Sequence, residues 1–131
     1  MKTYELVKLN GNKLELSEQV MRVLEISSGS VLLLELDRNE KEMTVSSIAE
    51  PNSEIIEMKA IMNNNPLSNA KVDYVLGENN ISIVYGEGQA VKGSYYSVKL
   101  LDVKEADISE TDLRKKLTET GVFKELELIR L

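Results

Sequence analysis

The sequence predicts an α+β protein built from two modules, a small β-rich hairpin module and a larger unit with the element order β-α-β-β-α-β. Clusters of Gly, Asn, Ser and Pro divide the chain into short segments with helical or strand periodicity. One linker separates the modules, Ala49–Ser53, because Pro51 cannot donate to a sheet ladder and disfavours helix before it. We therefore expect domains at residues 1–50 and 54–131.

The composition argues against an enzyme. The chain of 131 residues has no Cys and no His, which removes disulfides, thiolate chemistry, the usual neutral-pH acid/base group and the commonest metal ligand. We therefore expect no catalytic residues, no metal site and no cofactor.

Charge and hydropathy indicate where the protein is located and which partners are unfavourable. The formal net charge is −6, which disfavours non-specific attraction to nucleic acid. No apolar run approaches the roughly 18 residues that cross a membrane, and the N-terminus does not resemble a signal peptide. A cytoplasmic protein without membrane contact is expected.

The first module reads as two strand pairs around a short helix. Strands are expected over Tyr4–Leu9 and Lys13–Leu16, joined by the turn Asn10-Gly11, because both turn residues accept positive φ. Ser17 is a good N-cap for a helix that ends near Ser27–Gly29. Two further strands are expected over Ser30–Leu36, whose continuous apolar run is typical of a strand buried on both faces, and over Met43–Ile48.

The segment Lys8–Leu36, KLNGNKLELSEQVMRVLEISSGSVLLLEL, resembles the swapped-hairpin domain of AbrB/SpoVT/MazE-like DNA-binding proteins. Gly11 and Gly29 stand where that family has its two glycines, and Ser17 stands where it usually has Pro. The resemblance implies an obligate homodimer in which two chains exchange hairpins. It also implies DNA contact through basic residues on the hairpin strands and turns.

The residues expected to contact DNA surround the exposed turn and are Lys8, Asn10, Asn12 and Lys13. Phosphate neutralisation supplies most of the affinity of such modules. Acidic residues outnumber basic ones in this module, which leaves a second interpretation open, a dimerisation module without DNA affinity. The acidic residues are Glu5, Glu15, Glu18, Glu25, Glu35, Asp37, Glu40 and Glu42.

The second unit begins with a strand over Glu54–Met62 and an Asn-rich turn. A helix follows, in which Leu67, Ala70, Lys71, Tyr74 and Val75 recur at helical spacing and Val72 and Leu76 widen the same apolar face; Gly77, Asn79 and Asn80 are expected to end it. The remaining elements are strands over Asn80–Tyr85 and Tyr95–Val103, a helix capped by Ser109 and ended by Gly121, and a strand over Val122–Leu131. Gly86-x-Gly88 is more typical of a flexible connection than of a phosphate loop.

The segments PLSNAKVDYVLGENNISIV (Pro66–Val84) and SETDLRKKLTETGVFKELELIRL (Ser109–Leu131) resemble an ACT domain, a ferredoxin-like regulatory module that often senses amino acids. The resemblance implies side-by-side pairing and a ligand at the loop of Asn63, Asn64, Asn65, Pro66 and Leu67. A helix N-terminus and Asn side chains suit an amino acid. Asn64 replaces the family's usual Asp and Leu67 its Gly. A plain turn with a capped helix is the other interpretation.

Two functions follow from these observations. The first is a ligand-responsive transcriptional regulator, in which the ACT-like unit senses an amino acid or similar metabolite and the paired hairpins contact DNA. The second is a non-enzymatic regulatory or scaffolding protein that binds another protein and no DNA.

Overall fold

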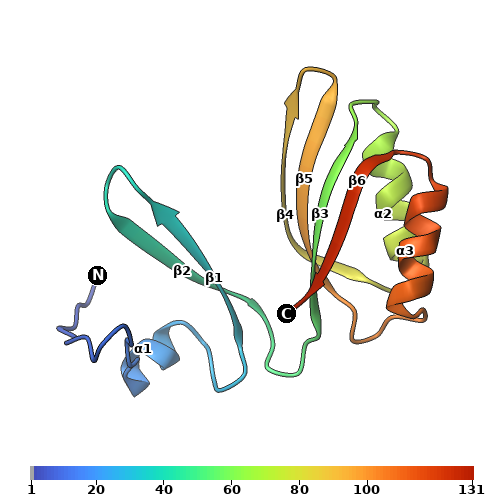
Figure 1. Ribbon diagram of the computed structural model, residues 1–131. Helices are drawn as coiled ribbons and strands as arrows, with labels where there is room; N and C mark the ends of the chain where they lie inside the picture. Colours follow the sequence, from blue (N-terminus) through green and yellow to red (C-terminus); the bar gives the residue numbers. More distant parts are fainter. Residues whose placement is uncertain (1) are drawn as a thin grey trace.

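The computed structural model describes residues 2–131 and shows a small α+β fold with three helices and six strands in two antiparallel sheets (Figure 1). The first module contains α1 (Glu18–Val23), β1 (Val31–Asp37) and β2 (Glu42–Ala49). The second contains β3 (Ile55–Asn63), α2 (Ser68–Glu78), β4 (Ser82–Val91), β5 (Ser94–Asp102), α3 (Glu110–Glu119) and β6 (Phe123–Arg130). The α+β class and the β-α-β-β-α-β order of the second unit are confirmed.

The second unit is one four-stranded sheet with strand order β4-β5-β3-β6. Each neighbouring pair is antiparallel, and β3 and β5 are the inner strands. Helices α2 and α3 lie side by side on the same face of this sheet (Figure 1). Successive strand residues point to opposite faces, so Met58 and Met62 of β3 pack under the helices while Lys59 lies on the other face.

The hydrophobic core belongs to the second unit. Its helices contribute Val72 and Leu76 from α2 and Leu113 and Leu117 from α3, each at most 1% exposed. All buried hydrophobic residues lie between Ile55 and Leu128, and no residue from 2 to 54 is buried. Burial of one such side chain contributes about 1.5–3 kcal/mol, so this stabilisation is concentrated in the second unit.

The first module departs from two of the predicted strands. The structure has no strand over Tyr4–Leu9 or over Lys13–Leu16. The backbone pairing that remains in this segment is an isolated β-bridge between Asn10 and Lys13. A strand needs a neighbour for its backbone groups, and an isolated two-stranded hairpin is marginal in water. The predicted strand sequences are therefore present without the partner that a sheet requires.

Helix boundaries follow the capping residues in part. Ser17 accepts a hydrogen bond from Val20 N, and Ser109 accepts one from Asp112 N, as predicted. The end of α1 differs, because Glu25 already takes a positive φ of 54° before the predicted stop. In α2, Gly77 lies inside the helix, and the left-handed residue is Asn80.

Strand β4 is longer than predicted. It runs without interruption through Gly86 and Gly88 to Val91, so the expected flexible connection is wrong. The chain reverses at Lys92-Gly93, where φ is 48° and 79°. Positive φ at both Lys92 and Gly93 matches the twist of a two-residue β-hairpin. The turn therefore lies at Lys92-Gly93 and not at Gly86 or Gly88.

No helix within residues 2–131 is long and apolar enough to cross a membrane.

Candidate functional site

The predicted DNA-contact residues share one exposed hairpin tip. Asn10 N donates to Lys13 O at 3.1 Å and Lys13 N donates to Asn10 O at 3.0 Å, which closes a two-residue turn. Its central residues are Gly11, with φ of 61°, and Asn12, so the turn is shifted by one from the predicted Asn10-Gly11. Lys8, Asn10, Asn12 and Lys13 are all exposed. Two ammonium groups and two amides are thus available to phosphate and base edges.

The arm that carries this tip is attached to α1. The Ser17 hydroxyl donates to the Glu5 carboxylate at 2.7–2.9 Å and accepts from the backbone of α1. The apolar side chains of the arm are left in solvent: Tyr4 is 90% exposed and Leu6 is 96% exposed. Tyr4 and Leu6 thus form part of an exposed apolar surface on the arm.

The β1–β2 hairpin has one apolar face. Leu34 pairs with Val45 and Leu36 pairs with Met43, so these side chains point to the same side. Leu34, Leu36 and Met43 are 53%, 74% and 47% exposed. The prediction that the strand over Ser30–Leu36 is buried on both faces is therefore wrong, because no residue of β1 is buried. In the sequence, Glu35 stands between Leu34 and Leu36, and this alternation indicates that one face of β1 is polar.

The predicted ligand loop uses its own polar groups. Asn65 Oδ1 accepts a hydrogen bond from Leu67 N at 3.0 Å, and Asn65 O accepts one from Ser68 N at 3.0 Å. Asn64 N donates to Gly93 O at 3.1 Å, and Asn63 N donates to Val122 O at 3.0 Å. The expected set of free N–H groups for a ligand carboxylate is therefore largely occupied. The side chains of Asn63, Asn64, Asn65, Pro66 and Leu67 are exposed.

A mainly apolar hollow of about 490 Å³ begins at the end of this loop. It is lined by Leu67, Ala70, Lys71, Tyr74, Val75 and Thr120. Sequence periodicity found most of these residues but assigned them to the core. Val72 and Leu76, which were predicted on the same apolar face, are buried, whereas Tyr74 is 70% exposed, so only part of the predicted face packs on the sheet. The loop thus contributes Leu67 to the hollow and holds its Asn residues outside it.

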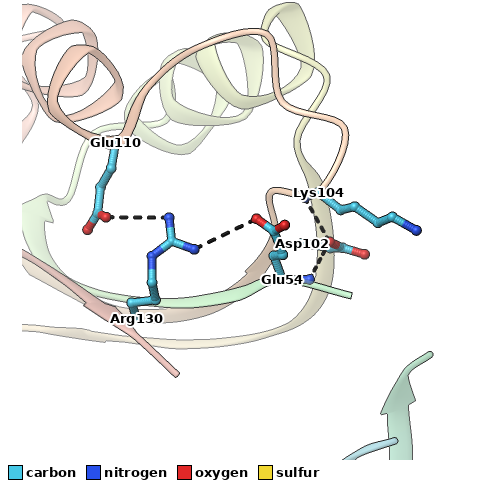
Figure 2. Close-up of polar contacts among 5 residues, drawn as sticks. All are labelled: Glu54, Asp102, Lys104, Glu110 and Arg130. Atoms are coloured by element: carbon cyan, nitrogen blue, oxygen red, sulfur yellow. Dashed lines mark hydrogen bonds and ion pairs between the residues drawn. The ribbon is translucent and has the colours of Figure 1, made fainter. Parts of the chain in front are cut away.

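A polar cluster lies within the second unit, next to the linker (Figure 2). Asp102 Oδ1 accepts hydrogen bonds from Glu54 N at 3.3 Å and from Lys104 N at 3.0 Å. Arg130 lies between two carboxylates, with its guanidinium 3.8 Å from Glu54 and 3.6 Å from Glu110. These contacts fix the start of β3 and the end of β6 to the N-terminus of α3. The cluster is already paired internally, so we assign it a structural role.

Tyr85 lies where the two modules approach each other. Strands β2 and β4 are in contact, and the Tyr85 hydroxyl donates to the Glu87 carboxylate at 2.8 Å. This hydrogen bond raises the pKa of Tyr85 above its usual 10.0, and desolvation and the charges of Glu87 and Glu35 raise it further. Glu35 belongs to β1, so the electrostatics of β4 depend on where the hairpin sits.

Neither a scan of protein-family models nor a search of curated proteins gives a match to this chain. Within residues 2–131, no group of three or more acidic side chains is placed to hold a metal ion.

Proposed function

We propose that this chain is a ligand-responsive DNA-binding regulator that acts as a homodimer. The observation that carries the proposal is a first module that buries none of its residues from 2 to 54 yet presents a polar, lysine-bearing tip. A module without a core gains its stability from a second chain. The exposed tip is then free to contact phosphates.

The first half of the proposal is dimerisation through the first module. The unpaired strand sequences 4–9 and 13–16, together with the apolar face of Leu34, Leu36 and Met43, offer both backbone groups and apolar area to a second copy. An exchange of hairpins between two AbrB-like modules satisfies both needs at once. The β1–β2 pair is already formed and would supply the surface on which the exchanged segments pack.

The second half is DNA contact by Lys8, Asn10, Asn12 and Lys13. Two dimer-related tips bring four lysines to a duplex, and each phosphate that is neutralised makes binding more sensitive to salt. Fluorescence anisotropy on duplex DNA at about 0.05 M and 0.2 M salt measures how strongly the binding affinity depends on salt. We expect clear weakening at the higher salt concentration.

The matched variants are Lys8→Glu/Lys13→Glu and Lys115→Glu/Lys116→Glu. Both change the net charge equally, but the second pair lies on α3, away from the first module. We expect only the first pair to abolish binding while circular dichroism stays unchanged. Wild-type protein that shows no salt-sensitive binding at low ionic strength removes the DNA function.

The ligand belongs to the ACT-like second unit. The sheet order β4-β5-β3-β6 with both helices on one face is the arrangement of ferredoxin-like modules, which supports this interpretation. The hollow beside Leu67 and Tyr74 suits an apolar side chain, and Lys71 offers an ammonium to a carboxylate. An amino acid with an aliphatic or aromatic side chain is therefore the ligand class we propose.

A thermal-shift panel of the common amino acids at millimolar concentration tests this site. A ligand that binds only the folded state raises the melting temperature. We expect a rise with an apolar amino acid, and loss of the rise in Tyr74→Glu but not in Tyr4→Glu, which makes the same substitution at an exposed tyrosine of the other module. A flat response across the whole panel argues against sensing.

Regulation requires the ligand to prefer one of two dimer arrangements. Strand β2 of the first module contacts strand β4 of the second unit, which supports a mechanical route between them.

The acidic character of the first module favours a second candidate, a regulatory or scaffolding protein that binds another protein and no DNA. Residues 1–50 contain nine Asp and Glu against six Lys and Arg. Dimerisation without salt-sensitive DNA binding is the outcome that this candidate predicts.

A further inference from the structure

The face of the second unit's sheet that α2 and α3 leave uncovered has an ordered arrangement of side chains. Registers place Glu127, Lys59, Val98 and Glu87 in one row across β6, β3, β5 and β4. The next row toward the β4–β5 turn contains Glu125, Ile61, Tyr96 and Gln89, and the row on the other side contains Ile129, Glu57, Leu100 and Tyr85. Alternation along each strand puts all twelve on the face opposite the helices.

On this face the inner strand β5 presents an apolar column, the other inner strand β3 presents Ile61, Lys59 and Glu57, and both edge strands present carboxylates. Tyr96, Val98 and Leu100 follow one another along β5, and Tyr96 is 48% exposed. Glu87 on β4 stands on one side of this apolar column, and Glu125 and Glu127 on β6 stand on the other. The face is hollowed over its middle, with a volume of about 580 Å³. All residues that line the hollow come from the four strands.

Its charge is strongly one-sided. Lys59 is paired with Glu57, which is 3.4 Å away on the same strand, so it neutralises one carboxylate. The side chains that line the hollow include three carboxylates, those of Glu87, Glu125 and Glu127, and one ammonium, that of Lys59. A second copy of this face would oppose carboxylates to carboxylates, and DNA would be repelled. The complementary occupant is cationic at its edges and apolar in its centre.

The dimensions match an α-helix. The apolar column spans four residue steps of β5, about 13 Å, or between two and three helical turns. The acidic edges on β4 and β6 are three strand spacings apart, about 14 Å, and a helix with its side chains is about 10–12 Å wide. A helix along β5 therefore places its apolar stripe on Val98 and brings flanking Lys or Arg side chains to both acidic edges.

We infer that this open face is a docking surface for a basic amphipathic helix of a partner protein, which would form a third layer on the sheet. Apolar contact at Tyr96, Val98 and Leu100 supplies the buried area, and Glu87, Glu125 and Glu127 select a helix with basic flanks. The exposed ring of Tyr96 offers its face to a Lys or Arg side chain. The surface is distinct from the hairpin tip and from the hollow beside Leu67, and the first module approaches it at the Tyr85 end, where β2 contacts β4. Docking of a helix here requires neither DNA binding nor amino-acid binding.

The test uses the full chain and a synthetic helical peptide of about 18 residues, with Leu at helical i, i+3, i+4, i+7 spacing and Lys elsewhere. A second peptide has Glu in place of every Lys. Amide chemical shifts of isotope-labelled protein identify the contacted residues, and fluorescence anisotropy gives the affinity. We expect shifts along β5 and at the inner positions of β4 and β6 with the Lys peptide, and no binding of the Glu peptide.

The decisive comparison is between Glu125→Lys/Glu127→Lys and Glu78→Lys/Glu119→Lys. The four glutamates are exposed and both variants change the net charge equally, but Glu78 and Glu119 lie at the ends of the helices. We expect about tenfold weaker binding for the first variant and little change for the second.

Equal loss in both variants, shifts confined to another surface, or no binding of the Lys peptide overturns the proposal. So does self-association that Glu125→Lys/Glu127→Lys abolishes in sedimentation experiments, because it would identify the occupant as another copy of this chain. Its exposed basic run Arg114–Lys116 on α3 would then be the contact.

Discussion

The ring of Tyr95 lies against the backbone of Gly88, in the space that a β-carbon at residue 88 would occupy. The two residues are on adjacent strands, β5 and β4, on the face that carries the helices. Tyr95 is half-buried and packs against the core, whereas its neighbour Tyr96 points to the open face. The glycine allows the edge strand to carry a large aromatic ring laid across it.

The first prediction concerns this contact. Gly88→Ala should destabilise the fold by about 1–3 kcal/mol, because the ring must leave its position in a packed interface. Gly86→Ala is the control, since a β-carbon there meets its nearest neighbour at 3.8 Å, an ordinary contact. Urea unfolding of both variants measures the difference. A Gly88→Ala protein as stable as Gly86→Ala would show that the ring moves without cost.

The second prediction concerns the linker. Asp102 accepts hydrogen bonds from two backbone N–H groups, so Asp102→Ala should cost about 1.5–3 kcal/mol in unfolding free energy. Asp102→Asn retains an acceptor oxygen and should recover part of the loss. Asp107→Ala, an exposed carboxylate in the same connection, should change stability by less than about 0.5 kcal/mol. Similar losses for Asp102→Ala and Asp107→Ala would exclude a specific role for the two bonds.

The third prediction is the titration of Tyr85. Its pKa is raised in the folded state, so the native protein holds this proton more tightly than the unfolded chain. The stability that results is fully present below pH 10, the unfolded value, and is lost as the pH rises through the folded pKa. NMR of the labelled phenol carbon should show the pKa falling in Glu87→Gln and, to a smaller degree, in Glu35→Gln.

The Glu35→Gln result also reports on the arrangement of the modules, because Glu35 is on β1 and Tyr85 is on β4. Glu42→Gln, an exposed carboxylate at the start of β2, serves as the control. A Tyr85 pKa that is unchanged in Glu35→Gln but falls in Glu87→Gln would place the hairpin farther from β4 in solution.

The fourth prediction is that the apolar hairpin face is an interface. If the proposed dimer forms through this face, Leu34→Glu/Leu36→Glu should shift it to monomer in sedimentation velocity, because two charges would then lie on the exposed surface that the dimer buries. Glu35→Gln on the other face of the same strand should leave the association unchanged. A dimer that persists in the double variant would have to be held by the second unit.

Local signals in the sequence determined most element positions. Ser17 and Ser109 predicted two helix starts, because a hydroxyl at that position satisfies a backbone N–H within the same turn. The order β-α-β-β-α-β followed from periodicity. The hairpin tip was also predictable, because Lys8 to Lys13 are close in sequence and depend only on one turn.

Only the tertiary structure decided which faces are buried and where strands stop. Leu67 and Tyr74 match the helical period as well as Val72 does, but only the sheet beneath α2 selects the buried side. In the sequence, Gly86 and Gly88 resemble a loop, whereas in the fold both pair with β5 and Tyr95 of that strand fills the space beside Gly88. The sequence of residues 4–16 has strand character, yet a strand requires a neighbouring backbone, and within the described residues this segment keeps only the bridge between Asn10 and Lys13. Local chemistry sets turns and caps, whereas burial and pairing depend on groups distant in sequence.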